Sequence, residues 1–224
     1  MKPQVKLAET LGADGATMAL YAHDGESCIR YAGQELMHSG ASASELLLGE
    51  LGVERLAQDA AARVLVGGLG LGFTLRSVLE HVGPQVTVEL VELLPEIVQW
   101  NRDHLKSLNG DLLNDARVEV HVADVVAHLR AAERDRYDVI LLDIDNGPTA
   151  MVAPSNASLY APLGLSRLRG LLKRGGRAVF WSAGPDVKFE GRLKRAGFQV
   201  GKVPAKVHPG AKRAAYLLYV AQNG

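Results

Sequence analysis

The chain of 224 residues carries 25 basic and 25 acidic side chains, so its formal net charge at pH 7 is zero. A hydrophobic content of 47% with 22% charged residues is typical of a globular protein and excludes a disordered chain. No overall field favours nucleic acid or a membrane surface, the one cysteine cannot form an intramolecular disulfide, and no apolar run reaches the roughly 20 residues of a membrane span. We expect a cytoplasmic protein with one substantial domain and a small N-terminal appendage.

The N-terminal residues favour short β-strands. Residues 17–23 and 27–32 flank the pair Asp24-Gly25, which is a strong hairpin signal, and 34–38 can add a third piece. We therefore predict a small β-hairpin region over residues 1–41.

From residue 42 onward, helical and apolar extended segments alternate. Residues 42–60 have helical spacing. The predicted strands that follow are 63–67, 86–92, 117–122, 137–143, 176–182 and 214–221. The predicted helices between them are 74–82, 95–108, 124–132, 158–173 and 186–196. Such alternation is typical of a parallel sheet covered on both faces. We predict an α/β protein with a Rossmann-like, doubly wound, mostly parallel sheet over residues 42–224 and the small N-terminal β appendage before it.

A glycine-rich loop follows the first of these strands. It contains Gly68, Gly70 and Gly72, and the next strand ends in Glu92. Glycines let the backbone approach a nucleotide-like ligand closely, and the following helix offers free N–H groups at its start. An acid at the next strand tip can bind both hydroxyls of a ribose. The order of these elements predicts a nucleoside site, and the alternative is a tight turn that binds no ligand.

Further acids follow two other strands at the same edge of the predicted sheet. Asp124 can accept a hydrogen bond from an exocyclic amine such as that of adenine, or it can cap the next helix. Asp143 and Asp145 end an apolar strand, where carboxylates are costly unless a positive or donating group meets them. Asp143 is the better candidate for a base that takes a proton from an attacking amine. The alternative is a turn built on two aspartates.

The sequence lacks the motifs of other common enzyme classes. Its seven histidines show no metal-ligand spacing, so we expect no metal site, and neither a nucleophile elbow nor a Walker lysine is present. Basic residues dominate between Arg167 and Arg213, which leaves an anionic partner open. A solvated surface is the favoured interpretation, because no aromatic residues interleave with these charges.

Taken together, the motifs from about Ile29 to Phe198 resemble the class I S-adenosylmethionine-dependent methyltransferase fold, and within it the spermidine synthase (polyamine aminopropyltransferase) group. The glycine loop before Thr74-Leu75-Arg76 is similar to that family's loop. The resemblance implies that Gly68, Gly70 and Gly72 hold the nucleoside, that Glu92 binds the ribose and that Asp124 lies beside the adenine. The family's Asp-Ser-Ser-Asp-Pro motif begins at Asp143, which implies a role for Asp143 at the nucleophile and beside the bound donor.

The acceptor half of the family's pattern is only partly matched. The resemblance implies substrate contacts from Glu45, Glu50, Asn146 and Tyr160. Leu71 replaces the loop acid that anchors the aminopropyl nitrogen in the family, and a leucine cannot pair with an ammonium. By this resemblance, the part of the site that binds the nucleoside is intact and the part that binds the amine is altered.

Our main functional hypothesis is a transferase that uses S-adenosylmethionine, or its decarboxylated form, and passes a methyl group to a small amine-like acceptor. Asp143, with Asp145, would orient or deprotonate the nucleophile. The alternative is aminopropyl transfer from decarboxylated S-adenosylmethionine. An RNA or DNA methyltransferase and a nucleoside-binding pseudoenzyme stay open. We further expect a small-molecule acceptor, no membrane partner and a homodimer.

Overall fold

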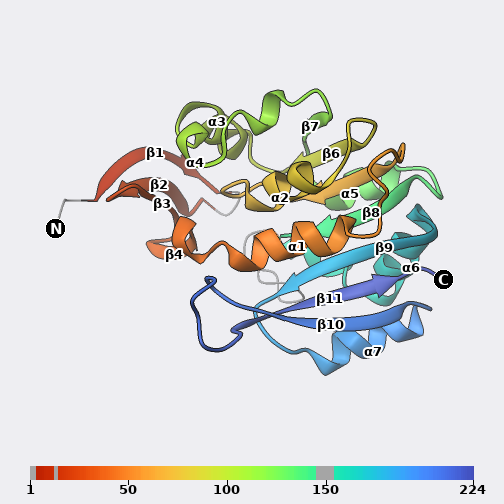
Figure 1. The fold of residues 1–224 in the computed structure, drawn as a ribbon. Helices are drawn as coiled ribbons and strands as arrows, with labels where there is room; N and C mark the ends of the chain where they lie inside the picture. The colour runs from red at the N-terminus through yellow and green to blue at the C-terminus, as the bar shows by residue number, and fades with distance from the viewer. Residues whose placement is uncertain (1–3, 13–14, 145–153) are drawn as a thin grey trace.

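The computed structural model describes residues 4–12, 15–144 and 154–224. Within them the chain forms a four-stranded and a seven-stranded sheet, and helices cover the larger one (Figure 1). The predicted α/β class with a mostly parallel sheet is confirmed. None of the helices in these ranges is long and apolar enough to cross a membrane.

The N-terminal sheet is antiparallel and larger than the predicted hairpin. Its strands, in spatial order, are β1 (Val5–Leu11), β2 (Thr17–His23), β3 (Glu26–Tyr31) and β4 (Gln34–His38). The polar sequence of β1 does not alternate cleanly, and a bulge at Lys6/Ala8 interrupts its pairing with β2, which explains why it was not predicted. One face of the sheet buries Met18, Leu20 and Ile29 in the main core. The division at residue 41 stays a prediction.

The seven-stranded sheet has the order β10-β11-β9-β8-β5-β6-β7. Its strands are β5 (Arg63–Gly67), β6 (Thr87–Glu92), β7 (Val118–Val122), β8 (Tyr137–Leu142), β9 (Leu172–Ser182), β10 (Gln199–Ala205) and β11 (Tyr216–Gln222). The strands from β9 to β7 are parallel, and β11 runs antiparallel to both of its neighbours. All six predicted strands are present, and β10, an edge strand whose exposed residues do not alternate regularly, was missed.

Helices lie on both faces of this sheet, as its apolar strands require. They are α1 (Ala43–Val53), α2 (Phe73–His81), α3 (Pro95–Asp103), α4 (Lys106–Asn109), α5 (Val125–Ala131), α6 (Pro162–Leu171) and α7 (Val187–Arg195). Short 3₁₀ turns are η1 (Ser39–Ala41), η2 (Leu112–Asn114) and η3 (Pro154–Ser158). One core cluster packs α1, α2 and α3 against the sheet, and a second packs α5, α6 and α7 against the other face.

Three predicted helices are shorter than expected. The helix expected over 42–60 ends at Val53, after which the chain turns toward β5. That expected over 95–108 is divided into α3 and α4, because the chain bends to bury Leu105. The helix expected over 158–173 begins at Pro162, since proline suits the first helical turn, and ends where β9 begins.

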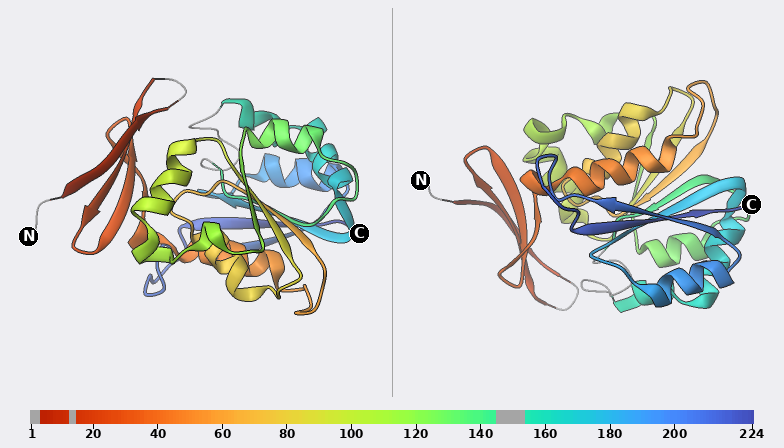
Figure 2. Two further views of the ribbon diagram at one scale, coloured as in Figure 1. Left: turned by 90° about the horizontal axis from the view of Figure 1, so that it is seen from above. Right: turned by 60° about the horizontal axis from the view of Figure 1, so that its bottom comes forward.

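The N-terminal sheet lies against the edge of the larger sheet at which the parallel strands end (Figure 2). Ligands of open parallel sheets bind in the crevice outside the carboxyl ends of the strands, where the order of connection reverses. Here that reversal falls at β5, which has β6 on one side and β8 on the other. The fold therefore places the glycine loop after β5 in the crevice and covers it with the N-terminal sheet.

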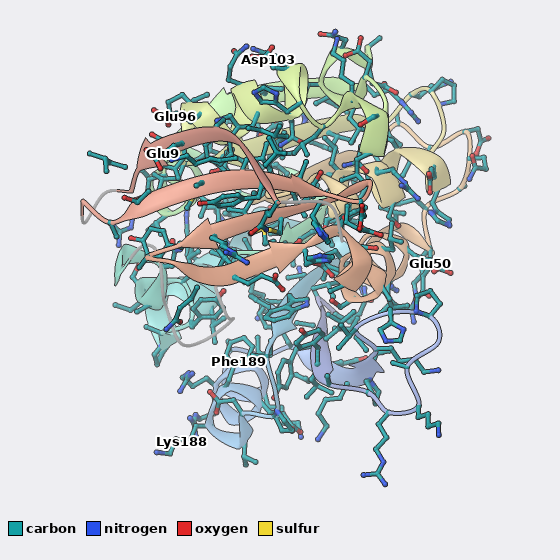
Figure 3. The ribbon with its side chains drawn as sticks, turned by 90° about the vertical axis from the view of Figure 1, so that its left-hand side faces the viewer. Glu9, Glu50, Glu96, Asp103, Lys188 and Phe189 are labelled. Atoms are coloured by element: carbon teal, nitrogen blue, oxygen red, sulfur yellow. The ribbon has the colours of Figure 1, made fainter. Side chains whose placement is uncertain are left out.

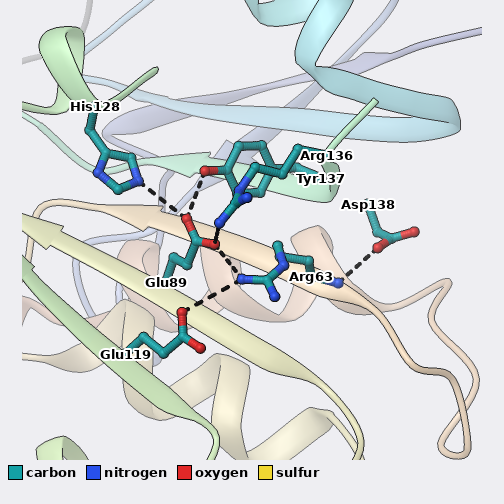
Figure 4. A network of polar contacts seen from close by, with 7 residues as sticks. All are labelled: Arg63, Glu89, Glu119, His128, Arg136, Tyr137 and Asp138. Atoms are coloured by element: carbon teal, nitrogen blue, oxygen red, sulfur yellow. Dashed lines mark hydrogen bonds and ion pairs between the residues drawn. The ribbon is translucent and has the colours of Figure 1, made fainter. Parts of the chain in front are cut away.

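A buried ionic cluster lies nearer the opposite ends of the strands. Glu89 of β6 is fully buried and accepts hydrogen bonds from Arg63, Arg136, His128 and Tyr137 (Figure 4). Burial alone would raise the pKa of Glu89, but these donors outweigh it and lower the pKa to about 2. The cluster joins three neighbouring parts of the fold around one carboxylate, and it is separate from the crevice.

Candidate active site

The crevice contains a pocket at the carboxyl ends of the parallel strands. It encloses about 690 Å³ of space between atoms, with open solvent at its mouth included. The larger sheet contributes Gly68, Glu92, Asp124 and Asp143. The N-terminal sheet contributes an apolar wall of Met18, Ile29, Leu36 and Met37. The residues predicted at four different strand ends therefore do meet in one cavity, which we call the nucleoside pocket.

Glu92 lies at the tip of β6 with only 8% of its surface exposed. One carboxylate oxygen accepts a hydrogen bond from the Leu69 N–H at 2.8 Å, and the other accepts from the Leu94 N–H at 2.9 Å. Burial raises the pKa of Glu92, and the backbone N–H groups oppose that rise. Each oxygen has further lone pairs, so the carboxylate is held in place while it can still accept hydrogen bonds from a ligand.

The glycine loop is built by close backbone packing. Gly68 has a φ of +92°, and a Cβ there would overlap the carbonyl oxygen of Asp143 after β8. The fold therefore requires this glycine whether or not a ligand binds. This agrees with the alternative from the sequence, a tight turn, and does not exclude a ligand. Gly70 and Gly72 also have positive φ angles. Gly68 lines the nucleoside pocket, Gly72 lines a neighbouring pocket, and Gly70 lines both.

Two asparagines hold the underside of this loop. Asn101 of α3 donates from Nδ2 to the Gly70 carbonyl at 2.9 Å and to the Ile97 carbonyl at 2.9 Å. Asn109 of α4 donates to the Leu71 carbonyl. The bend between α3 and α4 brings both amides to the loop, and sequence reasoning missed them because neither belongs to a recognisable motif.

Asp124 has one of the two roles that the sequence left open, the helix cap, and the contact with adenine stays a prediction. Its carboxylate accepts a hydrogen bond from the Val126 N–H at 2.7 Å and so caps α5. It also lines the nucleoside pocket. Asn156 of η3, which is 6% exposed, lines the same pocket and was not predicted.

A second pocket adjoins the first. It encloses about 650 Å³, again with open solvent included, and it is lined by Glu45 of α1, Asp143, Trp181 of β9 and the loop from Leu69 to Phe73. We call it the acidic pocket, because both titratable side chains that line it are carboxylates. Its other described lining residues are apolar side chains and glycines, so no basic side chain among them offsets that charge.

The two carboxylates of the acidic pocket influence one another. Asp143 Oδ2 accepts a hydrogen bond from Thr74 Oγ1 at 2.6 Å, and the same hydroxyl lies 3.4 Å from the Glu45 carbonyl oxygen. Burial raises the pKa of Asp143, and the Thr74 hydrogen bond offsets part of that rise. Burial and the charge of Asp143 together raise the pKa of Glu45 to about 7, while a hydrogen bond from Ser44 opposes them. Such a pair favours the entry of a cation, which stabilises both ionised forms.

Aromatic rings stand beside this pair. The Trp181 and Tyr216 rings are 4.8 Å apart between centroids. Burial raises the pKa of Tyr216, and the charge of Glu45 raises it further. Trp181 lines the acidic pocket. Two carboxylates and the aromatic side chain of Trp181 in one pocket suit an alkylammonium group.

Two of the predicted substrate residues lie elsewhere. Glu50 is exposed on α1 at the surface of the molecule (Figure 3), because five residues along a helix turn a side chain far from Glu45. Tyr160 is 2% exposed in the second core cluster, where its ring packs against Phe180 and Phe189. Neither lines either pocket. Asp145 and Asn146 lie outside the described residues.

Part of the basic surplus between Arg167 and Arg213 has structural partners. Arg167 donates to carbonyl groups at the end of α5, and Arg177 forms a 2.8 Å ion pair with Glu54. Lys194 and Lys202 both pair with Glu190. These contacts support the interpretation of a structural and solvated surface for those residues, which the sequence favoured over a nucleic-acid partner. Among the described residues, no three His, Cys, Asp or Glu side chains group as metal ligands.

Comparison with known proteins points to one family. Residues 41–180 match the spermine/spermidine synthase domain. The polyamine aminopropyltransferase of Pyrobaculum neutrophilum is 32% identical over 120 residues, which cover 53% of this chain and 40% of that protein. Polyamine aminopropyltransferase 2 of Pseudomonas aeruginosa is 39% identical over 116 residues, covering 48% and 32%. The chain thus spans less than half the length of these curated relatives.

Solved structures of similar fold give a consistent result. A spermidine synthase in complex with the transition-state analogue AdoDATO has a TM-score of 0.76 at 19% identity, and the match covers 98% of this chain and 74% of that one. The spermidine synthase of Thermotoga maritima has a TM-score of 0.71 at 19% identity, covering 98% and 73%. At this identity the likeness establishes the fold.

Proposed function

Because the chain belongs to the spermine/spermidine synthase family, we propose that it binds decarboxylated S-adenosylmethionine and transfers its aminopropyl group to an amine acceptor. One observation carries this proposal. Glu45 and Asp143 are two carboxylates in the pocket that adjoins the nucleoside pocket, and no basic side chain stands among the described residues that line it. Both the transferred group and the acceptor are ammonium ions, which this charge attracts.

The main hypothesis from the sequence, methyl transfer from S-adenosylmethionine, is not supported. The relatives found by comparison are aminopropyltransferases. Electrostatics favours the same choice, since the carboxylate of a methionine tail would meet Glu45 and Asp143 with like charge. Removing that carboxylate removes the repulsion and leaves an ammonium that the pair can hold. We therefore adopt aminopropyl transfer as the proposal.

The nucleoside half of the site would be occupied as the family resemblance implies. Glu92 is the acceptor for the ribose hydroxyls, since backbone N–H groups, among them those of Leu69 and Leu94, fix its carboxylate at the pocket. Asp124 lies at the adenine end of the same pocket, and the glycine loop provides close backbone contact between them.

The reaction itself needs alignment and one proton acceptor. The acceptor ammonium first loses a proton, and the nitrogen lone pair that this frees attacks the aminopropyl carbon bonded to the sulfonium sulfur, so that a carbon–nitrogen bond forms. The carbon–sulfur bond breaks, and its electron pair neutralises the sulfur to give a thioether nucleoside. The proton that the ammonium loses passes to Asp143, whose raised pKa suits a base near neutral pH.

The family's loop acid is replaced by Leu71, whose side chain is 4% exposed in the main core. The ammonium of the transferred group therefore depends on Glu45 and Asp143. Both carboxylates must hold two cations. We therefore expect substitution of either one to reduce activity more than it would if a third acid shared this role.

Isothermal calorimetry of the purified protein with S-adenosylmethionine and with its decarboxylated form tests the proposal. We expect the decarboxylated form to bind at least about tenfold more tightly. Equal or tighter binding of S-adenosylmethionine would contradict aminopropyl transfer and restore methyl transfer.

A transfer assay with decarboxylated S-adenosylmethionine and a panel of primary monoamines, diamines and polyamines tests the chemistry. We expect a thioether nucleoside and an aminopropylated amine as products, and we expect Asp143→Asn to lower kcat about 100-fold or more. Glu50→Gln is the control, because Glu50 is exposed and lines neither pocket. Tight nucleoside binding with no transfer to any amine would instead indicate a pseudoenzyme.

A further inference from the structure

Met37 of β4 lies at the boundary between the nucleoside pocket and the acidic pocket. Four residues line both pockets: Leu36, Met37, Gly70 and Asp143. Leu36 and Met37 come from the N-terminal sheet, whereas Gly70 and Asp143 come from the carboxyl edge of the larger sheet. The two pockets are therefore halves of one crevice, and they meet where the two sheets face each other.

At this boundary the Met37 side chain rests on the glycine loop. A Cβ placed on Gly70 would lie 2.6 Å from Met37 Sδ and 3.1 Å from Met37 Cε, so the end of the methionine lies directly against the Gly70 backbone. Gly70 can accept this contact because it has no side chain. Its φ of +50° is an additional reason for glycine at this position.

The two walls of the boundary differ in stiffness. On the loop side, the Gly70 carbonyl is held by Asn101, and Asp143 is held by Thr74. On the other side, Met37 is only partly buried, and an unbranched thioether chain with three rotatable bonds adapts its shape easily. Any change in the width of the boundary is therefore expected to come from Met37.

We propose that Met37 controls the passage between the nucleoside pocket and the acidic pocket, and so selects which groups on the nucleoside's sulfur can extend toward the acceptor. This inference rests on the proposed function, since it assumes that a nucleoside occupies the first pocket and that its tail reaches the second. Its consequence is specific. A nucleoside that ends at the sulfur is insensitive to the size of residue 37, whereas one whose tail crosses the boundary is sensitive to it.

Calorimetry with two probes tests this consequence. 5′-Methylthioadenosine carries only a methyl group beyond its sulfur, and decarboxylated S-adenosylmethionine carries the aminopropyl tail as well. For Met37→Phe, a larger and stiffer side chain, we expect the affinity for the tailed probe to fall about tenfold or more and that for 5′-methylthioadenosine to fall less than about threefold. Met37→Leu, which conserves volume, should change both affinities less than about threefold.

Met18 provides a matched control. It is a second methionine of the N-terminal sheet, and it lines the nucleoside pocket but not the acidic pocket. Met18→Ala should therefore weaken both probes by the same factor. Thermal melting without ligand checks that each variant is folded, and Met37→Ala, which adds no bulk, replaces Met37→Phe if the latter does not fold. Loss of tail contacts should then weaken only the tailed probe, by about threefold.

Equal losses for the two probes in the Met37 variants would overturn the inference and make Met37 a part of the nucleoside wall only. Unchanged affinities in Met37→Phe would overturn it as well. If the wild-type protein binds neither probe, the proposed function fails first, and this inference falls with it.

Discussion

At position 45 a carboxylate is partly buried beside a second carboxylate, and that arrangement costs stability in the absence of a ligand. The pKa of Glu45 rises from its ordinary 4.5 to about 7 through burial and the charge of Asp143. When the pKa of a carboxylate is higher in the folded state than in the unfolded state, its protonated form favours folding. This contribution to the free energy of unfolding is complete below the ordinary pKa and is lost as the pH rises through the folded-state pKa. The free protein should therefore lose stability between about pH 4.5 and pH 7 at this residue.

Glu45→Gln should make the free protein more stable while it impairs function. At pH 8 we expect the melting temperature to rise by roughly 2–4 °C, because the ionised pair is removed, and at pH 4.5 we expect little difference from the wild type. Aminopropyl transfer should fall about 100-fold. Differential scanning calorimetry at the two pH values measures the first effect. Glu50→Gln on the same helix is the control, and a lower melting temperature for Glu45→Gln at pH 8 would contradict the assignment.

Asn101 acts on the ligand through the glycine loop. Asn101→Asp keeps the side-chain shape but removes the two donated hydrogen bonds to the Gly70 and Ile97 carbonyls. We expect the affinity for 5′-methylthioadenosine to fall about tenfold, because the loop is no longer held in its binding conformation. Asn114→Asp is the matched control, since Asn114 is exposed and bonds only to Asp111 among the described residues. An unchanged affinity for Asn101→Asp, measured by calorimetry, would show that the loop keeps its shape without the amide.

Among the elements, β5, β6 and β8 are joined by the carboxylate of Glu89 as well as by their backbone hydrogen bonds. Arg63 belongs to β5, Glu89 to β6 and Tyr137 to β8, and Arg136 precedes β8 directly (Figure 4). With the pKa of Glu89 lowered to about 2, its ionised form stabilises the fold above the ordinary value of 4.5. That stabilisation is lost as the pH falls from about 4.5 toward 2.

Glu89→Gln should lower the free energy of unfolding by about 3–5 kcal/mol at pH 7, because two guanidinium groups lose their buried partner. The difference from the wild type should shrink below pH 4.5. Chemical denaturation at pH 7 and pH 3 measures both values. Glu119→Gln is the control, since Glu119 is about half exposed and lies 3.6 Å from the same Arg63, and we expect a loss of at most about 1 kcal/mol there. Similar losses for the two variants would argue against a special role for the buried carboxylate.

For the molecule as a whole, the nucleoside pocket lies between two sheets that are separate along the sequence. Met18, Ile29 and Met37 form one wall, and the strand ends of the larger sheet form the other. A ligand in this position contacts both sheets and stabilises their association.

Nucleoside binding should therefore protect both sheets from hydrogen exchange. With saturating 5′-methylthioadenosine, we expect slower exchange in β2 to β4 and in the glycine loop, and unchanged exchange in the hairpin of β10 and β11, which lines neither pocket. Mass spectrometry of peptic fragments resolves these regions. Protection confined to the larger sheet would show that the N-terminal sheet does not take part in nucleoside binding.

Local sequence patterns determined much of the fold and half of the site. The apolar strands, the glycines after β5 and the acid that ends β6 are neighbours along the chain, so their spacing alone places them at one edge of a parallel sheet. For this reason the predictions for Gly68, Glu92 and Asp124 as neighbours in one crevice agree with the structure. The same logic failed for β1 and β10, because edge strands with mixed exposure have no clear alternation.

Only the tertiary structure decided the acceptor half and the boundary between the pockets. Glu45 and Asp143 are almost a hundred residues apart, and they meet because α1 packs beside α2 and the end of β8. Tyr160 and Glu50 fitted a family pattern, yet packing placed one in the core and the other in solvent. Met37 reached Gly70 through the docking of one sheet on the other. Contacts of this kind depend on how separate elements pack, and no periodicity or spacing within a single segment encodes them.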